Sequence, residues 1–272
     1  MASFFSPLTG GAPLLQAPIA AVGGLPQTAV NADNPLAMGL ALGPSVLTMP
    51  VTPIRAASAR NLELMRSTVA PVTTIAEVDA TNLKALHDAI KPSFEATTNI
   101  PLTYLPFFAR ATALALMAHP IMNSIMTPQG FIVPRTINLG FAVQTPSGVL
   151  LPVIRNAETK SIPELARDIY VLSLRAQSGQ ITSQEMDGQT FVITNPGRYG
   201  QTLVGTPAIA PPNVGTLSFE AITRRVVALD NDQAAIRPMM YIALTADHRA
   251  VDGADMVGFM GRVKQALETL AL

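Results

Sequence analysis

The residue with the best setting for chemistry is His248, within residues 246–253 (ADHRAVDG). It follows an apolar run that predicts a β-strand over residues 239–245, and it precedes a run with helical spacing. Loops at strand ends often carry reactive groups in mixed α/β proteins. Histidine exchanges a proton near neutral pH, so His248 can serve as a general base. The alternative is a buried histidine that is hydrogen-bonded to Asp247 or Asp252.

A hydroxyl group is the second candidate. Thr194 ends the predicted strand over residues 190–194 and is followed by Asn195-Pro196-Gly197. A hydroxyl in this position can donate a hydrogen bond to an oxyanion that develops during a reaction. An ordinary threonine that caps a turn after a strand gives the same pattern, so the sequence leaves both interpretations open.

Other kinds of chemistry have little support in the sequence. His87 is expected at the surface of a helix, and His119, before Pro120, is expected to be structural at a helix end. The three histidines lack the spacing of metal ligands, and the chain has no cysteine, so we predict no metal site and no cysteine nucleophile. No phosphate-binding loop, dinucleotide fingerprint or serine nucleophile elbow is present.

The elements that must position these residues alternate between helical and strand periods. Ser161 and Glu164 form a capping box that predicts the start of a helix, and Thr182 with Glu185 repeats the pattern. This alternation predicts an α/β fold (an α+β sandwich) with helices packed on a mixed sheet. The predicted helices cover residues 55–67, 81–90, 104–117, 162–178 and 254–270, and the predicted strands cover residues 72–79, 137–143, 149–154, 190–194 and 239–245.

Composition limits the partners of the chain. The formal net charge is zero, so nothing drives the protein electrostatically toward nucleic acid or an anionic membrane. Only 13% of the residues are charged and 49% are hydrophobic, which favours a surface partly covered by other subunits. Residues 1–54 contain one charged residue, Asp33, and many prolines and glycines, so neither a targeting signal nor a membrane span is predicted. We interpret residues 1–54 as a linker or an apolar arm and residues 55–272 as the folded domain.

Together these segments resemble the dihydrolipoamide acyltransferases, the core subunits of 2-oxo acid dehydrogenase complexes. The stretch 246–253 resembles the active-site signature of that family. The similarity extends over roughly residues 50–272, and further matching segments are residues 101–123, 137–157, 190–200, 211–212 and 237–241.

The resemblance implies a chloramphenicol-acetyltransferase-like fold in which three subunits form a trimer with each active site between two of them. It assigns His248 as the base that takes a proton from the attacking thiol. It assigns Thr194, from the neighbouring subunit, as the oxyanion donor. Coenzyme A and dihydrolipoamide are then the substrates. Asp252 matches the signature aspartate, which is expected to fix the histidine loop through an ion pair with an arginine, and Arg60 is the best match for that arginine.

The sequence shows no lipoyl domain and no domain that docks the dehydrogenase subunits, so we expect either a truncated core or a stand-alone member of the family. In both cases we expect the lipoyl group to come from another domain or chain. The apolar C-terminus is expected to help assemble trimers into a core of 24 or 60 subunits, which would bind lipoyl domains and dehydrogenase subunits. The location that the resemblance implies is the bacterial cytoplasm or the mitochondrial matrix.

Acyl specificity gives two conflicting signals. Positions near the acyl pocket of succinyl-type members fall near Gln201 and Glu220, and a glutamate there would repel a succinyl carboxylate. We therefore expect a neutral acyl group, acetyl or branched-chain, although the residues from Arg237 onward are similar to the succinyl type. Two other functions stay open: a structural core paralogue without catalysis, and an acyltransferase of the same fold with another thiol or an amine as acceptor.

Overall fold

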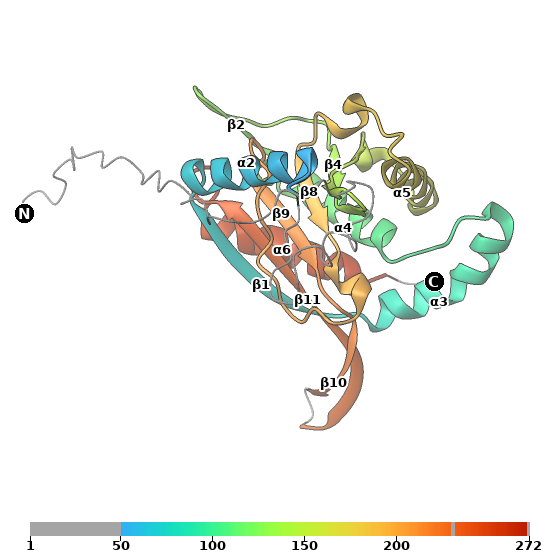
Figure 1. Cartoon of the computed structure of the whole chain (residues 1–272). Helices are drawn as coiled ribbons and strands as arrows, with labels where there is room; N and C mark the ends of the chain where they lie inside the picture. The colour runs from blue at the N-terminus through green and yellow to red at the C-terminus, as the bar shows by residue number, and fades with distance from the viewer. Residues whose placement is uncertain (1–49, 230–231, 271–272) are drawn as a thin grey trace, which may run out of the picture. The chain divides into compact units, whose positions relative to one another are not determined.

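A mixed β-sheet lies at the centre of the computed structural model, which describes residues 50–229 and 232–270 (Figure 1). Its strand order is β1-β11-β9-β8-β4-β7, and β10 pairs with the first half of β11. The pairs β9–β8 and β8–β4 are parallel and the other pairs are antiparallel. The strands are β1 (Pro71–Asp79), β4 (Leu139–Phe141), β7 (Val153–Ile154), β8 (Phe191–Thr194), β9 (Gly215–Phe219), β10 (Thr223–Ala228) and β11 (Ala234–Asp247).

Helices flank this sheet, as the sequence predicts. Nearly every side of α4 is buried, because it packs against both α5 and α6, and α6 also contacts β1 and β11. The core between these layers contains stacked aromatic rings, among them Phe108 on Phe219 with ring centroids 4.2 Å apart. The α-helices are α2 (Pro53–Thr68), α3 (Thr81–Thr98), α4 (Leu105–Ala118), α5 (Ile162–Gln177) and α6 (Gly253–Glu268).

Helix starts follow the predicted caps. The boxes at Ser161–Glu164 and Thr182–Glu185 are both present, and they begin α5 and the short helix η3 (Ser183–Met186). A third box, formed by Asp252 and Asp255, begins α6. The other short helices are η1 (Pro120–Asn123), η2 (Ala157–Thr159) and η4 (Pro196–Tyr199).

The predicted hairpin over residues 137–154 is present but interrupted. Its inner halves form a separate two-stranded sheet, β5 (Val143–Thr145) and β6 (Gly148–Leu150), while β4 and β7 remain in the main sheet. Pro152 lies at the break and has no N–H to give to a ladder, although its carbonyl still accepts a hydrogen bond from Phe141 N. A further small sheet pairs β2 (Ile125–Thr127) with β3 (Gly130–Ile132).

Residues Thr52–Leu272 form one compact unit. The predicted linker or arm over residues 1–54 falls almost entirely on residues 1–49, which lie outside the described residues. Among the helices that are described, none has both the length and the apolar character to cross a bilayer.

Candidate functional site

His248 lies in a tight turn between β11 and α6. Its backbone N–H donates to the carbonyl of Ala70 over 2.9 Å, which ties the turn to the residue preceding β1. The residue is exposed, and its ring makes no hydrogen bond within the described part of the chain. The imidazole is therefore free to meet a substrate while its backbone is held in place.

The turn is anchored by Asp247, a residue that the sequence analysis treated only as a possible partner of His248. Asp247 is 1% exposed. Its carboxylate accepts hydrogen bonds from the side chain and N–H of Arg249 and from the N–H of Ala70, and the shortest of these is 2.6 Å long. Burial alone would raise the pKa of Asp247, but these hydrogen bonds outweigh it and the pKa is lowered.

Asp252 has a different role from the one expected. Its Oδ1 accepts hydrogen bonds from Ala254 N (2.8 Å) and Asp255 N (3.1 Å), so it caps the N-terminus of α6. Arg60 is exposed on α2, and it forms no ion pair with Asp252 or any other described residue. Within one subunit the expected Arg60–Asp252 ion pair is absent from the described residues, and the charged pair of this loop is instead the buried Asp247 with the exposed Arg249.

Thr194 ends β8, two strands away from β11, and is distant from His248 in the same subunit. Its Cα pairs with Ser218 on β9, which in turn pairs with Ala243 on β11. His248 follows Ala243 by five residues, or about 16 Å of strand at roughly 3.3 Å per residue. The two site residues are therefore on the order of 15–20 Å apart, and one subunit does not bring them together.

A cavity of about 330 Å³ opens beside the end of β8. Asn195 and Gly197, which follow Thr194, line it together with Glu220. Glu220 is 1% exposed, so little of it faces the cavity, whereas Gln201 is exposed and does not line the cavity.

His87 is also part of this cavity, and the expectation that it lies at the surface is wrong. It is 5% exposed, its Nε2 lies 3.1 Å from the carbonyl of Leu102, and its ring stacks on Tyr104 at 4.2 Å. The expectation of an exposed side chain came from the neighbouring Asp88, but the chain folds back over the ring of His87 at Leu102. His119 is half-buried at the end of α4, where its ring packs against Gly258 of α6, in keeping with the structural role expected of it.

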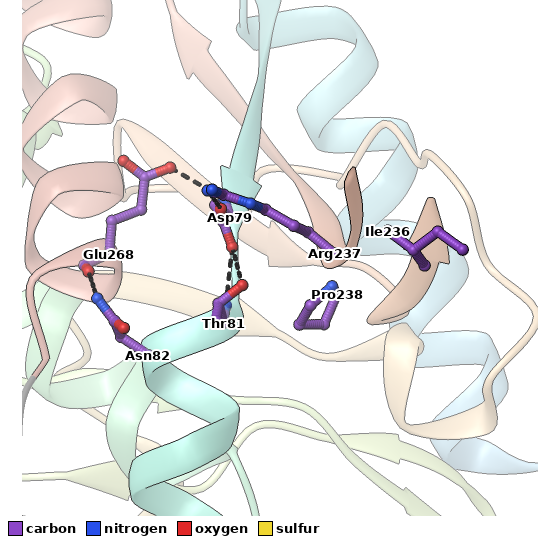
Figure 2. Close-up of a pocket in the computed structure, with 7 residues that line it drawn as sticks. All are labelled: Asp79, Thr81, Asn82, Ile236, Arg237, Pro238 and Glu268. Carbon is purple, nitrogen blue, oxygen red and sulfur yellow. Dashed lines mark hydrogen bonds and ion pairs between the residues drawn. The ribbon is translucent and has the colours of Figure 1, made fainter. Parts of the chain in front are cut away.

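Figure 2 shows a separate cavity of about 640 Å³ where β1, α3, β11 and α6 meet. Arg237 forms an ion pair with Asp79 (2.7 Å), and Glu268 accepts a hydrogen bond from the N–H of Asp79 (2.9 Å). These polar groups already bind one another and join the ends of the elements. His248 follows Met239, the partner of Asp79 in the sheet, by nine residues, so this cavity is remote from His248.

Comparison with known proteins identifies the family of this chain. A family model described as the catalytic domain of the 2-oxoacid dehydrogenases acyltransferase family matches residues 44–272. Among the described residues, no group of histidine and acidic side chains is placed to hold a metal ion.

Two curated relatives are similar over most of this chain. The lipoamide acyltransferase component of the branched-chain alpha-keto acid dehydrogenase complex of Bacillus subtilis is 37% identical over 82% of this chain and 52% of its own length. The succinyltransferase component of the 2-oxoglutarate dehydrogenase complex of Bartonella vinsonii is 38% identical over 80% of this chain and 53% of its own length. The chain thus spans about half the length of the curated relatives it matches.

Two solved structures share the fold, each with a TM-score of 0.79 and 32% identity over 83% of this chain and 93% of theirs. One is the cubic core of the pyruvate dehydrogenase multienzyme complex. The other is a dihydrolipoamide acetyltransferase from Azotobacter vinelandii, studied for the role of a serine, a histidine and, four positions later, an asparagine in its catalytic mechanism. By its family match and these similarities, the chain belongs to the 2-oxoacid dehydrogenase acyltransferase family, through that family's catalytic domain.

Proposed function

We propose that this protein transfers an acyl group between the thiols of dihydrolipoamide and coenzyme A. The observation that carries this proposal is the placement of His248: an exposed imidazole, without a hydrogen-bond partner among residues 50–229 and 232–270, on a turn that a buried Asp247 holds in place. A loosely held histidine would spend much of its time away from the reacting atoms, so a fixed turn favours catalysis.

The step is a thioester exchange. The imidazole of His248 takes the proton from the attacking thiol, and the thiolate forms a bond to the thioester carbonyl carbon. The oxyanion of the tetrahedral intermediate accepts a hydrogen bond from the hydroxyl of Thr194. The intermediate then collapses with cleavage of the old carbon–sulfur bond, and the leaving thiolate takes the proton back from the imidazolium.

The separation of the two residues within one subunit supports a site shared between subunits. Because His248 and Thr194 are roughly 15–20 Å apart in one subunit, a second copy must supply one of them. A cyclic trimer does this for all three sites at once, because each interface joins different surfaces of two neighbours. Asp252 would act by fixing the start of α6, and it follows His248 by four residues, the spacing between the histidine and the asparagine of the Azotobacter enzyme.

The acyl group is proposed to be neutral. Glu220 is buried next to the cavity that Asn195 and Gly197 line, and a carboxylate close to an acyl chain there disfavours a negatively charged chain such as succinyl. The relatives act in complexes for branched-chain, 2-oxoglutarate and pyruvate substrates, so similarity alone does not choose among acyl groups. Gln201 is exposed in one subunit and would lie at the edge of the acyl site.

The partners follow from the same proposal. The lipoyl group would be supplied by another domain or chain, and the trimers would assemble into a core of 24 or 60 subunits that binds dehydrogenase subunits. The cubic core among the structural neighbours supports such an assembly. Relatives occur in bacteria and in mitochondria, which supports the bacterial cytoplasm or the mitochondrial matrix as the location.

The test is a transfer assay with dihydrolipoamide and a panel of acetyl-, isobutyryl- and succinyl-coenzyme A. We expect the neutral donors to react fastest, and His248→Ala to lower kcat/KM by about 100-fold or more. Arg262→Ala, at an exposed position on α6, is the matched control and keeps full activity. A loss of less than tenfold in His248→Ala would show that the base is another group, and succinyl transfer fastest by tenfold would contradict the neutral acyl group.

A further inference from the structure

β10 and the first half of β11 form a two-stranded ribbon that extends beyond the rest of the sheet (Figure 1). Val226 of β10 pairs directly with Ile236 of β11, and these side chains are 73% and 60% exposed. Ala228 and Ala234, the next pair with side chains on the same face, are also exposed. We call these four residues the apolar ribbon face.

The opposite face of the ribbon is the one that holds it to the rest of the subunit. Arg225 forms an ion pair with Glu77 on β1 (3.1 Å), and Arg237 forms one with Asp79 (2.7 Å). A sheet with one face in water usually places its polar side chains in the water and its apolar side chains against the protein. This ribbon does the reverse, so its apolar face is suited to a contact with another molecule.

The ribbon also has little support from the sheet. The pairing of β1 with β11 ends at Asp79 and Met239, so within the described residues only β10 pairs with residues 234–238 of β11. A two-stranded ribbon alone is only marginally stable in water, and an apolar one with a free edge promotes aggregation unless something covers it. A partner that covers the apolar ribbon face removes both problems.

A second copy of this chain is the partner that the position of the ribbon favours. Ile222, the residue before β10, lines the cavity beside the end of β8 together with Asn195 and Gly197. The neighbour that brings its His248 to Thr194 must lie close to this cavity, so it also lies at the base of the ribbon. The similarity to the subunit of a cubic core agrees with contacts between copies.

We propose that the apolar ribbon face packs on the neighbouring subunit of the same trimer, the one whose His248 reaches Thr194. The choice of this neighbour rests on the proposed function. Each interface of a cyclic trimer joins two different surfaces, so every ribbon covers part of the next subunit and none stays exposed. β11 then carries the contact with one neighbour at its start and leads into the His248 turn, which serves the other neighbour, at its end.

Thiol labelling tests whether the face is covered, because the chain has no cysteine of its own. We expect Val226→Cys in the assembled full chain to react with a maleimide about tenfold or more slowly than in urea, since the interface must first open. Val171→Cys, at a 46% exposed position on α5, is the control and should react at nearly its rate in urea. A native rate for Val226→Cys within about threefold of its rate in urea overturns the proposal.

Charged substitutions test whether the cover is a second copy in the trimer. For Val226→Asp combined with Ile236→Asp we expect light scattering to give the mass of one subunit. We also expect kcat/KM for transfer to fall by about 100-fold or more, because unpaired charges would be buried at the interface. An oligomer of wild-type mass overturns the proposal. Trimers that stay active overturn it too, because the face would then lie between trimers.

Val226→Thr combined with Ile236→Thr separates a lost contact from a lost ribbon. Threonine is β-branched and favours strands, so the ribbon should persist while its face becomes more polar. We expect the dissociation constant of the oligomer to rise by about tenfold or more, and an unchanged constant overturns the proposal. A wild-type oligomer that transfers no acyl group contradicts the proposed function alone, because labelling and mass require no substrate.

Discussion

At the catalytic turn, burial decides which aspartate is the anchor. Asp247 lies one residue before His248, and Asp252 lies four residues after it. From the sequence, either aspartate could anchor the turn. The structure buries Asp247 against Arg249 and leaves Asp252 exposed as a helix cap. A carboxylate that accepts several charge-assisted and backbone hydrogen bonds is the stronger constraint on the turn.

Replacing Asp247 is expected to loosen the turn and to change the response to acid. Asp247→Asn should lower the free energy of unfolding at pH 7 by about 1.5–3 kcal/mol, since hydrogen bonds to a charged group are lost. It should also lower kcat, because His248 is the next residue. Urea unfolding and the transfer assay measure the two effects.

The stability that Asp247 contributes is expected to decrease in acid. Since the pKa of Asp247 is lowered in the folded state, its stabilising effect is present above its unfolded pKa and is lost as the pH falls below about 4. The gap in stability between wild type and Asp247→Asn should therefore narrow below pH 4. The exposed Asp187→Asn is the control, and a gap that stays constant from pH 7 to pH 3 would contradict a charged anchor.

The sequence identified His248 and Thr194 as candidates but not the anchor, and the reason is physical. From their spacing around His248, Asp247 and Asp252 are equally good candidates for the anchor. Asp247 is buried beside the start of β1, where it pairs with Pro71 and accepts a hydrogen bond from Ala70, 177 positions away in the chain, and no local pattern predicts such a contact.

Among the elements, α6 depends on its cap. An asparagine caps a helix about as well as an aspartate, while alanine provides no acceptor for the free N–H groups. We therefore expect Asp252→Asn to keep stability within about 0.5 kcal/mol of wild type and Asp252→Ala to lose about 1 kcal/mol. Thermal unfolding of both variants gives the comparison, and an equal loss in the two would show that the charge of Asp252 matters more than its cap.

The turn after β8 depends on a close backbone approach at Gly197. A Cβ there would lie 2.2 Å from backbone atoms of Glu220, which cannot move aside as a side chain can. Gly197→Ala should destabilise the protein by about 1–3 kcal/mol and reduce transfer, because Thr194 is three residues away. Gly261→Ala is the matched control, since a Cβ at that helical glycine meets nothing within 4 Å. If Gly197→Ala and Gly261→Ala are equally stable, the close backbone approach at Gly197 does not constrain the turn.

Helices were easier to predict from sequence than the central strands. Caps and apolar spacing are local, so α4, α5 and α6 begin and end close to the predicted residues. β9 and β10 were missed: β9 is buried on both faces and so lacks the alternation that marks a half-buried strand. The helix predicted to end at Ile90 continues to Thr98 as α3, with Pro92 inside it.

For the whole molecule, the distance between His248 and Thr194 is the strongest reason to expect that a second subunit completes the active site. The low content of charged residues, 13%, agrees with a surface that neighbours cover. In a lone subunit the base and the hydroxyl are too far apart to contact one substrate, so activity and oligomeric state are expected to be lost together.

Mixed oligomers test the shared site most directly. His248→Ala and Thr194→Val are each expected to be inactive as pure proteins. When the two are denatured together in equal amounts and refolded, a site that takes His248 from one subunit and Thr194 from its neighbour is intact in about a quarter of the interfaces of a randomly mixed cyclic trimer. We predict that the mixture recovers about a quarter of wild-type activity. If oligomers that are shown by mass to be mixed are no more active than either pure variant, the shared site is contradicted.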